Sequence, residues 1–173
     1  MPAGMSIVTN AWMAAACHEA GHAVAGLALG RKLMHVVVYP RGGTVPKTSD
    51  GCTRFCDDLK ADWRKDIVIA LAGRAAYAFL DPSSRFSRDE KGHSVDQDDV
   101  NLAHNRLFEK FPDVGDKRRE RRFMVWDCFV DKLVAAPSNS RAIVAVAEAL
   151  RDNGWRLDGA AATDIARTAR NAS

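Results

Sequence analysis

Apolar residues recur every three or four positions along most of the chain, and this spacing predicts a mainly helical protein. The first such segment, about 9–29, is rich in alanine, and Gly30 follows it at the position where a helix commonly ends. Five further helices are predicted over 58–80, from about 94 to 111, between Pro112 and Pro137, over 141–153 and over 159–170.

Two short segments have the composition of strands instead. Residues 33–39 are rich in β-branched side chains and end at Pro40, which predicts a strand at a sheet edge, because proline cannot continue the ladder. Residues 52–55 predict a second short strand, after a polar loop over 44–51. The predicted fold class is therefore mainly α with a small β-sheet, and a length of 173 residues favours one domain over 1–173.

Composition and charge narrow the function classes. The formal net charge of +3 is too small to predict nucleic acid or anionic lipid as the partner. No window offers about 20 uncharged apolar residues, and the N-terminus lacks the pattern of a signal peptide, so we expect no membrane segment. Four cysteines are too few for a disulfide scaffold and favour a cytoplasmic location. Without a glycine-rich phosphate loop, we expect no nucleotide hydrolysis.

The candidate chemistry concentrates in His18-Glu19-Ala20-Gly21-His22, an HExxH motif inside the first predicted helix. Histidines four residues apart project from one helix face, about 6 Å apart at Cβ, which suits two ligands of one tetrahedral Zn²⁺. Glu19 then lies beside the metal without binding it, where it can act as a general base. A shuffled chain of this composition would contain roughly 0.004 such motifs, so a chance pair of structural histidines is disfavoured.

A catalytic zinc site needs a third protein ligand, and the best candidates open the third predicted helix. At 100° per residue, Asp96 and Asp99 lie on or beside the apolar stripe that begins at Val100, whereas Asp98 points away. A carboxylate that faces a core needs a compensating cation. The other interpretation is that these aspartates only favour a helix N-terminus. The pattern itself leaves Asp96 and Asp99 as alternatives.

Five motifs follow one another along the chain: His18-Glu19-Ala20-Gly21-His22-Ala23, Val36-Val37-Val38-Tyr39-Pro40-Arg41-Gly42, Ala72-Gly73-Arg74-Ala75-Ala76, Asp99-Val100-Asn101-Leu102-Ala103, and Ala147-Glu148-Ala149-Leu150 with Leu157-Asp158-Gly159. In this order they resemble the zinc peptidase domain of FtsH-type ATP-dependent proteases, over nearly the whole chain. The resemblance implies a mainly helical peptidase fold in which the strand after the zinc helix helps to hold an extended substrate. It also implies that His18, His22 and Asp99 bind Zn²⁺ and that Glu19 is the base.

The resemblance bears on the choice between the two aspartates. The run of aspartate, aliphatic residue, two others and alanine favours Asp99, whereas Gly92-x-Ser94-x-Asp96 resembles the loop before the family's ligand and favours Asp96. We take Asp99 as the third ligand and Asp96 as the alternative. Two features depart from the family. Tyr77 stands where it usually has a glutamate, and its ATPase module and membrane anchor have no counterpart in these 173 residues.

These observations predict a soluble zinc-dependent metallopeptidase that hydrolyses peptide bonds in short or unfolded polypeptides. A zinc-activated water would attack the peptide bond, with Glu19 as general base. The expected partner is an extended peptide or unfolded protein, without nucleic acid or membrane; a homo-oligomer and an ATPase acting in trans stay open. The alternative is a catalytically inactive peptidase-like module with a binding or regulatory role, which Tyr77 and the missing ATPase module keep open.

Overall fold

The computed structural model describes residues 11–39, 51–56, 62–82 and 97–172. It is mainly helical with one small antiparallel sheet, and this confirms the predicted fold class at that level. In chain order the elements are α1 (Ala11–Ala28), β1 (Leu33–Val38), β2 (Gly51–Phe55), α2 (Trp63–Leu80), α3 (Gln97–Lys110), α4 (Asp116–Ala135), α5 (Pro137–Asp152), β3 (Arg156–Asp158) and α6 (Gly159–Asn171). Each predicted helix has a counterpart among them.

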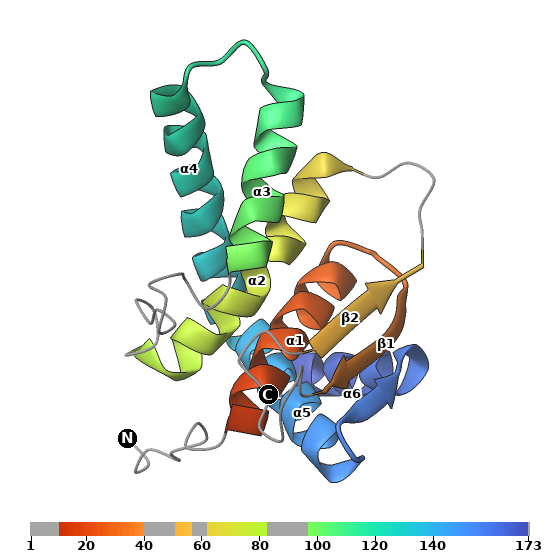
Figure 1. Ribbon diagram of the computed structural model, residues 1–173. Coiled ribbons are helices and arrows are strands. Elements are labelled where there is room, and N and C mark those ends of the chain that lie inside the picture. The colour runs from red at the N-terminus through yellow and green to blue at the C-terminus, as the bar shows by residue number, and fades with distance from the viewer. Residues whose placement is uncertain (1–10, 40–50, 57–61, 83–96, 173) are drawn as a thin grey trace.

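Helix α1 lies at the centre of the fold and packs against α2, α5 and the sheet (Figure 1). Its sequence is apolar on every face rather than along one stripe, which is the pattern of a buried helix, and every residue from 13 to 26 is buried. Small residues allow close packing, because a Cβ at Gly21 would lie 2.5 Å from the main-chain oxygen of Ala72 in α2. Beyond the helix, Gly30 has a φ of 75°, as its position predicts.

The strands have the order β2-β1-β3, with antiparallel pairing on both sides of β1. Val36 of β1 lies opposite Thr53 of β2 on one side and opposite Leu157 of β3 on the other. The prediction of an edge strand over 33–39 is therefore wrong. The described strand ends at Val38, two positions before Pro40, and its pairing on both edges is complete without the proline.

Two further differences from the predicted elements have simple physical reasons. Helix α5 begins at Pro137, not at 141, because proline at the first helical position lacks only an N–H that would have no intrahelical partner. Strand β3 was not predicted, since its three residues include a single apolar side chain, Leu157.

The side chain of Asp62 caps α2 by accepting a hydrogen bond from the N–H of Arg64. The predicted helix start at Ser94 lies outside the described residues. The described part of α3 begins at Gln97.

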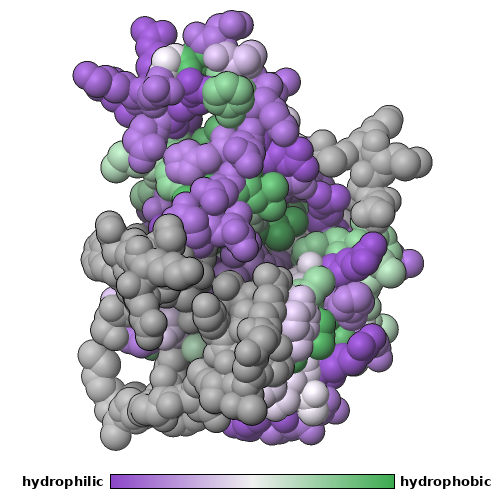
Figure 2. Space-filling view, in the orientation of Figure 1, coloured by the Kyte–Doolittle hydropathy of each residue, from purple (hydrophilic) through white to green (hydrophobic). Residues whose placement is uncertain are grey.

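Helices α3 and α4 form a hairpin that projects from the rest of the molecule, at the top of Figure 1. Helix α2 packs along the hairpin: Trp63 makes edge-to-face contacts with Phe111, just beyond the end of α3, and with Trp126 of α4. An ion pair between Arg74 of α2 and Asp127 of α4 adds a second connection. Hydrophilic side chains cover most of the hairpin on the face shown in Figure 2. Among the described residues, no helix combines the length and the apolar character needed to cross a membrane.

This arrangement positions the site. Helix α2 packs against both α1 and the hairpin, so the first turn of α3 comes to lie beside the middle of α1. The middle of α1 carries the HExxH motif, and the first turn of α3 carries Asp98 and Asp99.

Candidate metal centre

The polar residues of the HExxH motif lie inside the apolar core. His18, Glu19 and His22 are only 1%, 3% and 8% exposed, and Asn139 is the other buried polar side chain among the described residues. Three ionisable groups on one buried helix require compensation, because burying polar and charged groups without partners is costly. Their partners come from α2, α3 and β2.

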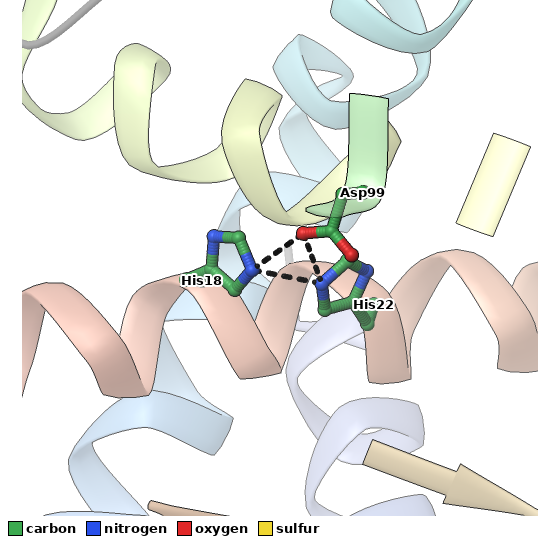
Figure 3. Close-up of side chains that lie close together, drawn as sticks. All are labelled: His18, His22 and Asp99. Carbon is green, nitrogen blue, oxygen red and sulfur yellow. Dashed lines mark hydrogen bonds and ion pairs between the residues drawn. The ribbon is translucent and has the colours of Figure 1, made fainter. Parts of the chain in front are cut away.

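Two imidazoles and one carboxylate converge at a single point (Figure 3). The Nε2 atoms of His18 and His22 are 2.9 Å apart. One carboxylate oxygen of Asp99, Oδ2, lies 3.0 Å from Nε2 of His18 and 3.4 Å from Nε2 of His22. The histidines therefore point from one turn of α1 towards an aspartate that α3 brings from the opposite side.

This geometry fits a zinc ion. Ligand atoms 2.0–2.1 Å from a tetrahedral metal are about 3.3 Å from one another, close to the three separations in the cluster. In addition, Nδ1 of His22 lies 2.6 Å from the main-chain oxygen of Ile69, which accepts a hydrogen bond from a protonated Nδ1. A neutral imidazole in this tautomer has its lone pair on Nε2, the atom that faces Asp99. Two histidines and one carboxylate are also a ligand set typical of catalytic zinc.

The charges in the cluster are strongly coupled. Burial by itself lowers the pKa of His22, but the Asp99 carboxylate, together with Glu19, outweighs burial and raises this pKa to about 9. Burial also works to raise the pKa of Asp99, yet the two imidazoles hold it well below its usual range. The carboxylate therefore requires a positive charge beside it. A proton supplies that charge in the metal-free protein, and a divalent cation can take the proton's place.

Gly73 provides the space in which the two imidazoles meet. A Cβ at this position of α2 would lie 2.5 Å from Nε2 of His22 and 2.7 Å from Nε2 of His18. Any larger residue would therefore intrude among the ligand atoms themselves. The backbone of α2 forms one wall of the site at Gly73 and orients His22 through the oxygen of Ile69.

Glu19 lies next to the histidines around α1, on the side of the helix that faces β2. Its Oε2 accepts a hydrogen bond of 2.7 Å from the hydroxyl of Thr53, and the same hydroxyl lies 2.9 Å from the main-chain oxygen of Glu19. Gly51 leaves room for the carboxylate, because a Cβ there would lie 2.5 Å from Oε1. The carboxylate is also close enough to His22 to contribute to the raised pKa of that imidazole.

The structure brings together most of the residues that the sequence singles out. Asp99 meets His18 and His22, whereas Asp98 is exposed, as helical spacing predicts. The alternative ligand Asp96 lies outside the described residues.

Sequence reasoning missed the roles of Ile69, Gly73, Gly51 and Thr53. Gly73 belongs to one of the motifs of the resemblance, but spacing alone gave it no role. Gly51 falls in the predicted loop over 44–51 and Thr53 in the predicted strand over 52–55, whereas both belong to β2. Only the alternation of residues 51 and 53 on one strand face could have indicated their roles.

Comparison with models of protein families found no match, and neither did comparison with curated proteins. The likeness to FtsH-type zinc peptidase domains thus rests on the order of the motifs in the sequence.

Proposed function

We propose that this protein is a zinc-dependent metallopeptidase that cleaves peptide bonds in short or unfolded polypeptides. The observation that carries the proposal is the convergence of His18, His22 and Asp99, with ligand atoms 2.9–3.4 Å apart, beside the buried carboxylate of Glu19. Three protein ligands and one adjacent base are the minimal set for metal-assisted hydrolysis. The same residues match the motifs that resemble FtsH-type peptidase domains.

A zinc ion held by His18, His22 and Asp99 would supply Lewis-acid chemistry: it would polarise a carbonyl and lower the pKa of a water molecule towards ~7. The protein's own contribution to the reaction is the movement of protons. Thr53 holds Oε2 of Glu19, which leaves Oε1 to take a proton from the attacking water and return it to the leaving amine. The main-chain oxygen of Ile69 keeps His22 in the tautomer that a ligand needs, and Asp99 would balance the charge of the cation.

The substrate strand in this proposal is β2 rather than β1. Both edges of β1 are paired, whereas the edge of β2 that faces away from β1 has no strand partner among the described residues. An extended peptide can add to such an edge through main-chain hydrogen bonds, which makes binding tolerant of sequence. Because Thr53 and Gly51 contact Glu19, a peptide on this edge would run past the base. A folded protein cannot present an extended strand in this way, so unfolded chains are the expected substrates.

The test compares cleavage of a reduced, unfolded protein by zinc-loaded wild type, by chelator-treated wild type and by two variants. Glu19→Gln should bind one zinc ion per chain and lose cleavage by at least about 100-fold, since the general base is gone. Glu120→Gln makes the same chemical change on the exposed surface of α4 and should cleave like wild type. Zinc binding without cleavage by wild type would contradict the peptidase proposal and favour a binding module. Undiminished cleavage by Glu19→Gln would remove Glu19 from the mechanism.

A further inference from the structure

We propose that Thr53 is a positioning residue that fixes the carboxylate of Glu19 in its working orientation. The inference rests on the proposed function for its catalytic meaning, but the contact itself is a property of the metal-free chain. The hydroxyl of Thr53 lies 2.7 Å from Oε2 of Glu19, and both side chains are at least partly buried. A hydrogen bond to a carboxylate is among the stronger ones that a hydroxyl makes.

The donor is held rigidly. Thr53 is β-branched, so the strand backbone restricts its first side-chain torsion. It lies opposite Val36 in the β1–β2 ladder, and β1 is in turn fixed by pairing with β3 on its other edge. Its hydroxyl also reaches the main-chain oxygen of Glu19, 2.9 Å away. The flexible partner is the glutamate, whose carboxylate would otherwise sample several rotamers.

Gly51 supports the same arrangement from two residues earlier on the same strand face. A Cβ at Gly51 would lie 2.5 Å from Oε1, so Glu19 takes this orientation because no side chain stands there. Strand β2 thus makes room for one carboxylate oxygen and holds the other with a hydroxyl. A peptide paired with the open edge of β2 would be aligned to the base by the same strand that orients the base.

The kinetic test uses variants that separate the hydroxyl from the shape of the side chain. Thr53→Val keeps the shape and should lower kcat about 10- to 100-fold, while KM and zinc affinity change less than about twofold, because only the base is misplaced. Thr53→Ser keeps the hydroxyl and should recover most of kcat. Thr163→Val removes a comparable hydroxyl, which donates to the oxygen of Gly159 in α6, and serves as the matched control.

These measurements can overturn the inference. If Thr53→Val cleaves like wild type, or if Thr53→Ser is as slow as Thr53→Val, the hydroxyl does not position the base. A drop in kcat that Thr163→Val reproduces would show a general loss of stability instead. A marked loss of zinc affinity in Thr53→Val would also count against it, since the hydroxyl contacts Glu19 and none of the proposed ligands.

A second readout needs no activity. In a double-mutant cycle on the metal-free protein, Thr53→Val and Glu19→Ala should affect the free energy of unfolding non-additively, because each removes the same hydrogen bond. The single hydroxyl proton is shared between the carboxylate and the main-chain oxygen of residue 19, and the main-chain acceptor stays in Glu19→Ala, so the coupling energy reports the share of the bond that goes to the carboxylate. Additive effects overturn the inference whatever the activity. Non-additive effects support the contact between Thr53 and Glu19 even if the protein cleaves no peptide. If the protein then binds zinc without cleaving, the peptidase proposal fails and the contact stands.

Discussion

At the scale of single residues, Gly73 is the position where the smallest change should do the most damage. In Gly73→Ala the new methyl group would overlap the Nε2 atoms of His22 and His18. These imidazoles cannot easily withdraw, because both are buried and His22 is bonded to Ile69. We expect zinc affinity to fall about 10- to 100-fold, as measured by competition with a chromophoric chelator.

The matched control for this prediction is Gly115→Ala. A Cβ at Gly115 has no neighbour within 4 Å, so zinc affinity should stay at the wild-type value. Wild-type zinc affinity in Gly73→Ala would mean that the ligands do not meet beside α2.

Two neighbouring aspartates give a second comparison at this scale. Asp99→Asn removes the charged ligand that faces the histidines, and zinc affinity should fall at least about 100-fold. Asp98→Asn changes an exposed residue one position earlier on the same helix and should leave zinc affinity unchanged. Isothermal titration of the metal-free proteins with zinc measures both. The opposite ranking of the two variants would exclude Asp99 as the third ligand.

The sequence could predict the ligands on α1 but not the choice of the third. His18 and His22 belong to one helix, so their separation follows from helical geometry alone. Asp99 is about 80 positions away, and only the packing of α2 between α1 and the hairpin brings it to them. The hydrogen-bond partners of Glu19 and His22 could not be predicted for the same reason, since Thr53 and Ile69 belong to other elements.

Among the secondary-structure elements, the open edge of β2 is the proposed site of substrate binding. Successive residues of an extended peptide alternate in the direction of their N–H groups, so only every second one can pair with β2. In a set of substrate peptides that each carry one backbone N-methyl group, KM should rise at alternate positions around the cleaved bond. Methylation on the intervening positions is the internal control.

A uniform effect of methylation along the peptide, or none at any position, would contradict strand addition. Either result would be compatible with the proposed metal site but would require another mode of substrate binding.

The elements themselves were largely predictable, and the exceptions are informative. The helices have enough residues for their 3.6-residue period to show, so each was predicted. Strand order was not, because β1 becomes central only through β3, about 120 residues later in the chain. Pro40 suggested an edge, but a proline just beyond a strand does not reveal how many neighbours that strand has.

At the scale of the whole molecule, the cluster should make stability depend on pH in a way that zinc reverses. In the zinc-free protein the pKa of His22 is raised from 6.5 to about 9, with Asp99 outweighing the effect of burial. A raised pKa contributes stability that is complete below pH 6.5 and is lost as the pH rises through 9. The free energy of unfolding should therefore fall by up to about 3 kcal/mol across this window. Asp99, with its lowered pKa, affects stability only in acid.

Zinc needs deprotonated imidazoles, so the stabilisation by saturating zinc should instead grow over the same pH window. Urea unfolding at pH 6.5 and pH 9, with chelator and with zinc, measures both trends. Zinc-free Asp99→Asn is the control, because without the carboxylate the stability should lose most of its dependence on pH. Parallel pH curves with and without zinc would be inconsistent with metal binding at these histidines.

We propose that His18, His22 and Asp99 hold one zinc ion together, and anomalous diffraction at the zinc absorption edge can locate that ion. Crystals grown with zinc should show one strong anomalous peak per chain, about 2.0–2.2 Å from Nε2 of both histidines and from a carboxylate oxygen of Asp99. The claim would be contradicted by a peak bound to other residues, Asp96 in place of Asp99 included, or by the lack of any peak between the two imidazoles.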